Sequence, residues 1–264
     1  MFTSIDLLEK HKPIIYYHPN EKYFVDDPVD YFKKTEAIYK KNGNACHRKA
    51  PSMYLYDWND EKKLYKIRDK KTKLPYDYAM YKKRANVIAK EKKVNGKIYL
   101  SYLVFFPFNG NKRVAGVFPT GAHWADLEEF HVVLDAITRK VLYYILSTHG
   151  DGNVYNKDPN SSKLELEGSH PIIYASVNSH AFYGTPGSYV RFGGAGNDNT
   201  KKGKKFIPEI LKYESDSVKN VIDWKGKLGP DGINSFPARF TEDGTPSIID
   251  KIKPHFTRVP EFIM

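Results

Sequence analysis

The sequence contains only one cysteine, Cys46, among its 264 residues. A disulfide within the chain is therefore excluded, and with it the disulfide scaffold of small secreted domains. A zinc site built from thiolates is not expected either, because such sites use several cysteines. Cys46 stands beside His47 in the segment NGNACHRKAP, which is typical of a surface loop, so we do not expect this pair to be catalytic.

The sequence also lacks any long apolar run. No stretch approaches the roughly eighteen apolar residues that a membrane-spanning helix needs. The N-terminal residues MFTSIDLLEKHKP do not have the basic start and apolar stretch of a secretory signal. We therefore expect no signal peptide or transmembrane segment, and a location in the cytoplasm, peripherally on a membrane or in a virion.

Several motifs of known chemistry are absent. There is no Gly-x-Ser-x-Gly elbow, no P-loop and no dinucleotide-binding fingerprint. Zinc-finger and RNA-recognition signatures are missing too, so nucleic acid is not an expected partner. We expect a binding protein ahead of an enzyme.

Positive charge, in contrast, is abundant. Lys and Arg number 42 against 31 Asp and Glu, which gives a net charge of +11. The lysines concentrate in residues 40–43, 60–74, 81–97 and 199–205. Such segments attract an anionic partner, for example phospholipid headgroups or acidic glycans, or they form a solvated surface without a partner.

Aromatic and β-branched runs indicate a β-rich core. Tyr, Phe and Trp make up 14% of the chain, far more than a disordered chain carries. The runs predict core strands over residues 97–108, 130–135, 141–147 and 171–177, with the second and third forming a hairpin. We predict a mainly β fold, a single-domain β-sandwich over residues 1–264 with long loops and a few short helices.

Other segments carry weaker signals. Residues 4–10 predict a short helix. Residues 193–205 are rich in glycine and lysine and predict a loop. Residues 207–223 show mixed helical periodicity, and residues 247–253 could add a helical turn.

The segment GAHWADLEEFHVVLD, residues 121–135, carries the strongest functional signal. It places His123, Asp126 and Glu128 at spacings of three and two. Carboxylate oxygens with one imidazole suit a divalent cation such as Ca²⁺, Mg²⁺ or Mn²⁺. The alternative is an exposed polar turn that binds nothing.

Seven segments in one order give a family resemblance. They are KPIIYYHPNEKYFVDDPVDYF, SYLVFFPFNG, GAHWADLEEFHVVLD, LSTHG, GSHPIIYASVNSHAFYGTPG, the ND–T pair in NDNTKKG, and WKGKLG followed by SFPA. Together they resemble the vacuolar protein sorting sixty-two-related family. The resemblance covers about residues 10–240 and leaves residues 241–264 as a C-terminal extension.

The central motif is also similar to that of the necrosis-inducing protein family of cytolysins. The resemblance implies that His123, Asp126 and Glu128 line a Ca²⁺ or Mg²⁺ site at the mouth of a cleft in a β-sandwich. In that family the function is contact with plant membrane sphingolipids followed by membrane damage. The chain departs from the motifs at Leu127, where both families usually have Trp.

Two further departures lie beside it. Ala125 replaces the second histidine of the necrosis-inducing motif, and Glu129 stands where the sorting-related family usually has histidine. Together with the missing signal peptide and disulfides, these departures bear on cytolytic activity rather than on the fold or the metal.

Four more residues are candidates for the same cleft. His149 ends one predicted strand and His180 follows another, so both are expected near the loops of the sandwich, as contacts to a ligand or as ties within their own turns. Asn109 could offer a carbonyl oxygen to calcium. His131 lies just beyond the motif, and strand alternation leaves its face open.

We therefore expect a divalent-metal-binding β-sandwich protein that recognises an anionic or glycosylated surface such as a membrane. A metal-dependent hydrolase of phosphoesters or glycans remains an alternative, with histidine as acid or base. A structural role with protein partners in a larger assembly, such as a virion, is the third.

Overall fold

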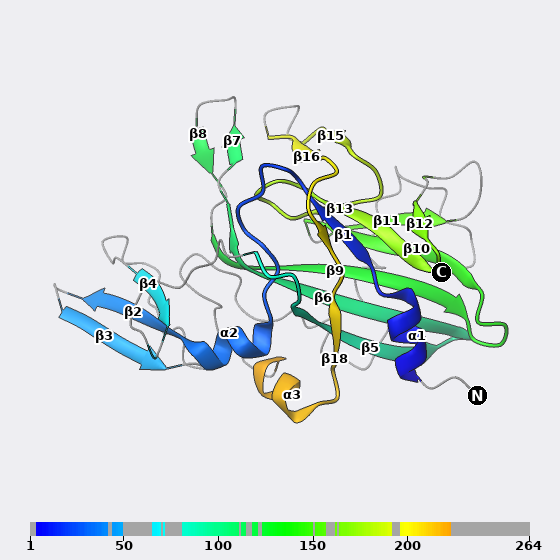
Figure 1. Cartoon of the computed structure of the whole chain (residues 1–264), viewed down its shortest axis with the longest axis horizontal. Helices are drawn as coiled ribbons and strands as arrows, with labels where there is room; N and C mark the ends of the chain where they lie inside the picture. Colours follow the sequence, from blue (N-terminus) through cyan, green and yellow to red (C-terminus); the bar gives the residue numbers. More distant parts are fainter. Residues whose placement is uncertain are drawn as a thin grey trace.

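Figure 1 shows the computed structural model, which describes most of the chain. The described residues are 4–41, 44–49, 65–69, 71, 81–110, 112–114, 118–120, 123–149, 151–156, 162, 164–191 and 196–222. Within these ranges lie three helices, α1 (Ser4–His11), α2 (Pro28–Lys34) and α3 (Asp216–Ile222). The longest has eight residues, so no described helix is long enough to cross a bilayer.

The larger sheet has six strands in the order β11-β10-β9-β6-β5-β18. Its strands are β5 (Asn86–Val94), β6 (Lys97–Asn109), β9 (His123–Asp135), β10 (Val141–Thr148), β11 (Asp151–Asn156) and β18 (Glu209–Lys212). All neighbours are antiparallel except β5 and β18. The two central strands, β6 and β9, are also the longest, at thirteen residues each.

The second sheet has five strands. β12 (Leu166–Glu167), β13 (His170–Ala175), β1 (Ile14–Tyr17) and β17 (Lys205–Phe206) follow one another, and β14 (Phe182–Tyr183) pairs with β13. β1 runs parallel to β13, although more than 150 residues separate them. Smaller sheets are formed by β2 (Thr35–Lys41), β3 (Asn44–Lys49) and β4 (Tyr65–Asp69), by β7 (Lys112–Val114) and β8 (Phe118–Thr120), and by β15 (Gly187–Tyr189) and β16 (Asp198–Thr200).

One apolar core joins the two large sheets. Because side chains alternate along a strand, β6 and β9 each direct every second residue to this core. The core includes Leu100, Val104, Phe106, Phe130 and Val132 from the larger sheet and Ile15, Tyr17, Ile173 and Phe182 from the second. Two packed sheets around a shared core make the predicted β-sandwich.

The predicted core strands are confirmed. β6, β10 and β13 match them closely, and β9 starts seven residues earlier than predicted, at His123. β9 and β10 form the predicted hairpin. The predicted N-terminal helix is α1. Residues 247–253 and the extension 241–264 lie outside the described residues, as do the side chains of Cys46 and His47 on β3.

One prediction for the later chain is wrong, and a second holds only in part. Residues 193–205 are not all loop, because β16 lies within them and β17 begins at their end. Residues 207–223 are not all helical, because β18 precedes α3.

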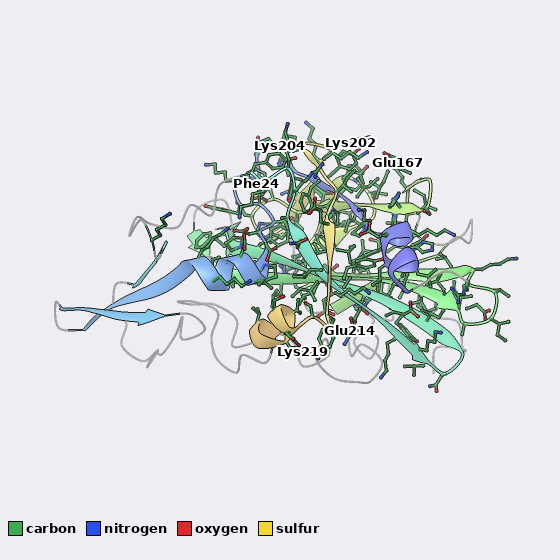
Figure 2. The ribbon with its side chains drawn as sticks, turned by 60° about the horizontal axis from the view of Figure 1, so that its bottom comes forward. Phe24, Glu167, Lys202, Lys204, Glu214 and Lys219 are labelled. Carbon is green, nitrogen blue, oxygen red and sulfur yellow. The ribbon has the colours of Figure 1, made fainter. Side chains whose placement is uncertain are left out.

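The lysines of the supposed loop pack against aromatic rings, which composition could not reveal. Lys202 lies over the ring of Tyr16 at 4.8 Å, and Lys204 lies 4.9 Å from the ring centre of Phe24 (Figure 2). Such cation–π contacts stabilise a basic segment on a sheet. Gly203 permits the close approach, since a Cβ there would come within 2.5 Å of the Tyr17 carbonyl oxygen.

Candidate functional site

Strained backbone gathers at one end of the sandwich. Among the described residues, six other than glycine have a positive φ, which non-glycine residues rarely adopt. Asn95 and Arg139 are in turns at the end where β6 begins and β9 ends. The other four, Ala125, His149, Asn178 and His180, lie at the opposite end. Such strain persists only where surrounding contacts hold it, and it concentrates at functional sites.

The same end carries a cluster of polar side chains. We call it the polar cluster, and it consists of Glu21, Asp126, Glu128, His149, His180, Arg191 and Asp198.

Three members of the polar cluster, His180, Asp126 and Glu21, form an ionic triad. Nδ1 of His180 lies 2.9 Å from Oδ2 of Asp126, and Nε2 lies 3.8 Å from Oε1 of Glu21. The imidazole is fully buried and stacks on Phe106 at 3.8 Å between ring centres.

The triad holds His180 in its charged form. Burial by itself lowers the pKa of His180, but the charge of Glu21, together with the hydrogen bond to Asp126 and its charge, outweighs burial and raises the pKa to about 9. Burial likewise acts to raise the pKa of Glu21, and the charge of His180 overcomes it, so that this pKa is lowered. At neutral pH the triad is therefore an imidazolium between two carboxylates.

Glu21 is fixed by backbone groups. Its Oε1 accepts hydrogen bonds of 2.8 Å from the amides of Lys22 and Tyr23, and its Oε2 accepts one of 2.7 Å from the amide of Asn178. These contacts tie the segment after β1 to the turn between β13 and β14. Glu21 thus orients His180, which in turn orients Asp126.

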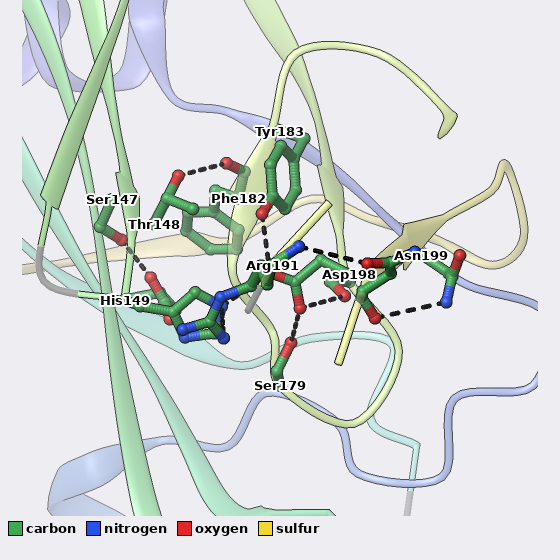
Figure 3. A network of polar contacts seen from close by, with 12 residues as sticks. Ser147, Thr148, His149, Ser179, Phe182, Tyr183, Arg191, Asp198 and Asn199 are labelled. Carbon is green, nitrogen blue, oxygen red and sulfur yellow. Dashed lines mark hydrogen bonds and ion pairs between the residues drawn. The ribbon is translucent and has the colours of Figure 1, made fainter. Parts of the chain in front are cut away.

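Asp198 is the hub of a second network, which Figure 3 shows. This carboxylate is fully buried. Its Oδ1 accepts from the hydroxyls of Ser176 at 3.1 Å and Ser179 at 2.7 Å, and its Oδ2 accepts from the hydroxyl of Tyr183 at 2.7 Å. These three hydroxyls give both oxygens of the buried carboxylate a hydrogen-bond donor.

His149 and Arg191 connect this hub to the surface. Nε2 of His149 lies 2.7 Å from Oδ2 of Asp198 and 2.6 Å from Nη1 of Arg191. A guanidinium only donates, so Nε2 either donates to Asp198 or accepts from Arg191. Both side chains are 25% exposed, which gives a ligand access to them.

The turn between β13 and β14 links both networks. His180 faces Asp126, and its neighbour Ser179 faces Asp198. Backbone hydrogen bonds fix this turn: the amide of His180 donates to the carbonyl of Ser176, and the carbonyl of Asn178 accepts from the amide of Gly110. The left-handed conformations of Asn178 and His180 belong to this turn.

Of the predicted metal ligands, the structure describes the side chains of Asp126 and Glu128. They are two residues apart on β9, so they point to the same face. Glu128 is buried and its Oε2 accepts from the hydroxyl of Ser147. His123 pairs through its backbone with Asn109 at the start of β9, but its side chain lies outside the described residues. Among the described side chains, no three acidic, His or Cys groups form a metal site.

The other predicted cleft residues divide into two groups. His149 and His180 lie in the polar cluster, and the buried Asn109 ends β6 opposite His123. His131 does not join them. It lies beside Ser101 on the other face of the sheet, with Nδ1 2.9 Å from the Ser101 hydroxyl and Nε2 3.2 Å from Glu129.

The sequence analysis missed Glu21, Tyr183, Arg191 and Asp198. A signal existed for Asp198, because the ND–T pair belongs to the family resemblance, but its lysine-rich surroundings predicted a loop. Glu21 stood in the YYHPNEKY segment without a partner nearby in sequence. The contact between Asp198 and His149 spans 49 residues, and Glu21 and His180 are still farther apart in the sequence, so no local pattern reveals these contacts.

Two of three comparisons with known proteins find relatives of this chain. The family described as Vacuolar protein sorting-associated protein 62 matches residues 4–220. The comparison with curated proteins gives no match. Among solved structures, the non-toxic HaNLP3 protein is similar with a TM-score of 0.49 and 14% identity, over 97% of this chain and 94% of that one.

Two further structures are similar at the same level. Necrosis and Ethylene inducing Protein 2, from the causal agent of cocoa's Witches Broom disease, has a TM-score of 0.44 and 17% identity, over 84% of this chain and 81% of that one. NLPPya in complex with mannosamine has a TM-score of 0.46 and 17% identity, over 94% and 89%. A structure of NLPPya with glucosamine is also similar.

Proposed function

The chain belongs to the Vacuolar protein sorting-associated protein 62 family, and we propose that it is a binding protein whose polar cluster recognises a hydroxyl-rich ligand, a glycan or a glycosylated headgroup. This family membership confirms the resemblance that seven sequence segments predicted. The proposed ligand rests on the chemistry of the polar cluster.

One observation carries the proposal. His180 holds Oδ2 of Asp126, while Oδ1 has no hydrogen-bond partner among the described residues. The side chain is 13% exposed, so a ligand can reach part of the carboxylate. An ionised carboxylate oxygen is a strong acceptor for hydroxyl groups, and it is also a preferred ligand of Ca²⁺ and Mg²⁺. The ionic triad supplies the fixed orientation that either use requires.

A divalent cation is part of the proposal. Asp126 and Glu128 share a face of β9 and offer hard oxygen donors, and the motif spacing adds His123 as the third protein ligand. Calcium or magnesium bound by these residues would coordinate hydroxyl or phosphate oxygens of the ligand. Asn109 is the proposed source of a further oxygen, since it ends β6 opposite His123.

His149 and Arg191 extend the proposed site toward solvent. An imidazole and a guanidinium offer several hydrogen-bonding groups to adjacent hydroxyls, and the guanidinium also pairs with an anionic group of the ligand. Asp198 positions both groups from beneath. The net charge of +11 adds a general attraction to an anionic surface.

The test measures binding of wild type and Asp126→Ala to a panel of glycans and glycolipid vesicles, each with Ca²⁺ and with a chelator. Glucosamine and mannosamine are the first soluble probes, because structures of NLPPya with both exist. We expect selective binding by wild type, lost in Asp126→Ala and reduced by the chelator. Asp30→Ala, an exposed acidic position on α2, is the control that should bind like wild type.

The arms of this experiment separate the parts of the proposal. Binding lost in Asp126→Ala but unchanged by the chelator keeps the ligand site and removes the metal. Equal binding of wild type and Asp126→Ala under both conditions contradicts the site itself.

The contact between His149 and Asp198 favours a second candidate, a metal-dependent hydrolase. A partly exposed histidine held at 2.7 Å by a buried carboxylate resembles a general base with its positioning residue. Turnover of a generic phosphoester that requires metal and is lost in His149→Gln would support this function. Ligand binding without turnover of the phosphoester would contradict the hydrolase and support a binding protein.

A further inference from the structure

A cavity of about 490 Å³ lies at the end of the sandwich opposite the polar cluster. Three segments enclose it: the last turn of α1, the turn between β9 and β10, and the turn between β12 and β13. Figure 1 shows α1 beside these turns. Asp135, at the end of β9 beside this cavity, comes nine positions after Asp126. At about 3.3 Å per residue the two sites are roughly 30 Å apart.

The charge around this cavity is entirely positive among its described lining residues. Lys10, Arg139 and Lys140 line it, and no acidic residue does. Within the described ranges none of these three cations forms an ion pair, whereas the nearby Lys12 and Lys205 pair with Glu9 at 2.8 Å and Glu167 at 2.7 Å. Three cations left without a counter-ion around one cavity are free to bind an anion.

The turn that carries two of the cations is rigid. Oδ1 of Asp135 accepts from the amides of Ile137 at 3.1 Å and Thr138 at 2.7 Å, and the amide of Arg139 donates to the carbonyl of Asp135 at 2.9 Å. These contacts fix Arg139 at a φ of 57°, where glycine would be free of strain. Arginine is more strained than glycine in this conformation, so it does not stabilise the turn. We therefore look to its side chain for a role in binding a ligand.

Much of the remaining lining is apolar. Leu7 and Val141 contribute aliphatic surface, and burial raises the pKa of Tyr144 to about 12, which keeps its phenol uncharged. The tip of the same turn carries Ile137, which is 91% exposed. An anion with an apolar or ring-shaped body suits such a lining better than an inorganic ion alone.

We propose that this cavity is a second ligand site, which binds a phosphate group through Arg139, Lys140 and Lys10 and packs the rest of the ligand against Leu7 and Val141. Phosphate matches the forked donors of arginine and the point charges of lysine. The phosphate belongs either to a lipid headgroup, with Ile137 entering the bilayer interface, or to a soluble phosphorylated molecule. The site is independent of the proposed glycan site, because the two share no residue.

Arg139→Gly tests the proposal with little risk to the fold. Glycine removes the guanidinium and accepts the positive φ without strain. We expect wild type to bind inorganic phosphate saturably in an NMR titration, with amide shifts at residues 136–141, and Arg139→Gly to bind at least about tenfold more weakly. Two controls should bind like wild type: Asn95→Gly, a positive-φ position on the adjacent hairpin, and Lys83→Gln, an exposed lysine before β5.

Vesicle sedimentation distinguishes the two sources of phosphate. Wild type is compared on phosphatidylcholine vesicles with and without a phosphoinositide, at fixed ionic strength. If Arg139→Gly and Ile137→Ser both lose the phosphoinositide-dependent fraction, the ligand is a lipid headgroup. If both variants sediment like wild type while Arg139→Gly still loses inorganic phosphate, the ligand is a soluble phosphorylated molecule. Absence of saturable phosphate binding, or equal binding by wild type and Arg139→Gly, overturns the proposal.

Discussion

At the scale of single residues, the polar cluster depends on charges that are buried and paired. Asp198 is fully buried and accepts from three hydroxyls, while His149 lies beside it. The hydroxyls satisfy the oxygens of the buried carboxylate, and the carboxylate in turn fixes the hydroxyl groups. A buried charge in such a network is costly to alter, because the change leaves the remaining groups unsatisfied.

Asp198→Asn should therefore destabilise the protein strongly. The amide has lost the charge and presents a donor to groups that are themselves donors, so we expect a loss of about 3 kcal/mol in the free energy of unfolding. Urea denaturation measures this loss. Asp30→Asn, an exposed residue paired with Lys34, should change stability by less than about 0.5 kcal/mol. Equal stability of the two variants would mean that the hub does not hold the site.

The ionic triad makes stability depend on pH. His180 binds its proton more tightly in the folded state, where its pKa is about 9, than in the unfolded state, where it is 6.5. Its contribution is complete below pH 6.5, declines above it, and is lost once the pH exceeds 9. The lowered pKa of Glu21 acts in the opposite direction, because its contribution is present above its unfolded pKa of 4.5 and declines as the pH falls.

Wild type should accordingly lose about 3 kcal/mol of stability through His180 between pH 6 and pH 9.5. Urea denaturation at both values tests this, with His180→Gln as the variant that cannot titrate. Its stability should change much less over the same range. Direct observation of the imidazole nitrogens by NMR should give an apparent pKa near 9, and a value near 6.5 would contradict the triad.

At the scale of elements, the turn between β13 and β14 positions the site through close packing. A Cβ on Gly110 would approach Cε2 of Tyr23 to 2.4 Å and Oδ1 of Asn178 to 2.8 Å. Gly110→Ala must therefore displace the turn, and with it His180. We expect a cost of about 1–3 kcal/mol, as for other overpacked sites, together with weaker ligand binding.

Gly187→Ala is the matched control for this change. A Cβ there has no neighbour closer than 3.7 Å, so stability and binding should stay near wild type. Urea denaturation and the glycan assay on both alanine variants give the comparison. If Gly110→Ala binds ligand as well as Gly187→Ala does, the position of the turn does not matter for recognition.

The sequence predicted the elements of the core but only part of the site. The strand β6 was predictable because its sequence is a long run of aromatic and β-branched residues, which is typical of a buried central strand. Asp126 and His180 were both candidates, although their direct contact was not foreseen. The face of His131 was left open by strand alternation, and in the structure it lies beside Ser101 and Glu129, away from Asp126. Asp198 was hidden in a lysine-rich segment whose packing depends on distant aromatic rings.

At the scale of the whole molecule, the two ends of the sandwich differ in charge and in proposed ligand. The polar cluster contains four carboxylates, whereas the opposite cavity is lined by three cations that form no ion pair with any residue the structure describes. The chain as a whole carries a charge of +11. This charge draws the protein to anionic surfaces in a manner that salt weakens, because exposed charges are screened beyond about 8 Å at physiological ionic strength.

Nonspecific adsorption should therefore separate from recognition. On phosphatidylserine vesicles, sedimentation of wild type and Asp126→Ala should fall together as NaCl rises from about 50 to 500 mM. Binding to a glycan selected from the panel should persist at the higher salt in wild type alone. If glycan binding falls with salt as steeply as adsorption to phosphatidylserine does, both are nonspecific attraction by the net positive charge, and the proposed recognition is contradicted.

The most direct test of the central proposal locates the ligand on the molecule. Amide NMR spectra are recorded while CaCl₂ and then glucosamine are added to wild type and to Asp126→Ala. The account predicts saturable shifts at Asn109, Asp126, Glu128 and the turn 176–181 in wild type, with none at the turn 136–140, and no saturable shifts in Asp126→Ala. Saturable shifts elsewhere, or shifts in the cluster that Asp126→Ala retains, would contradict it.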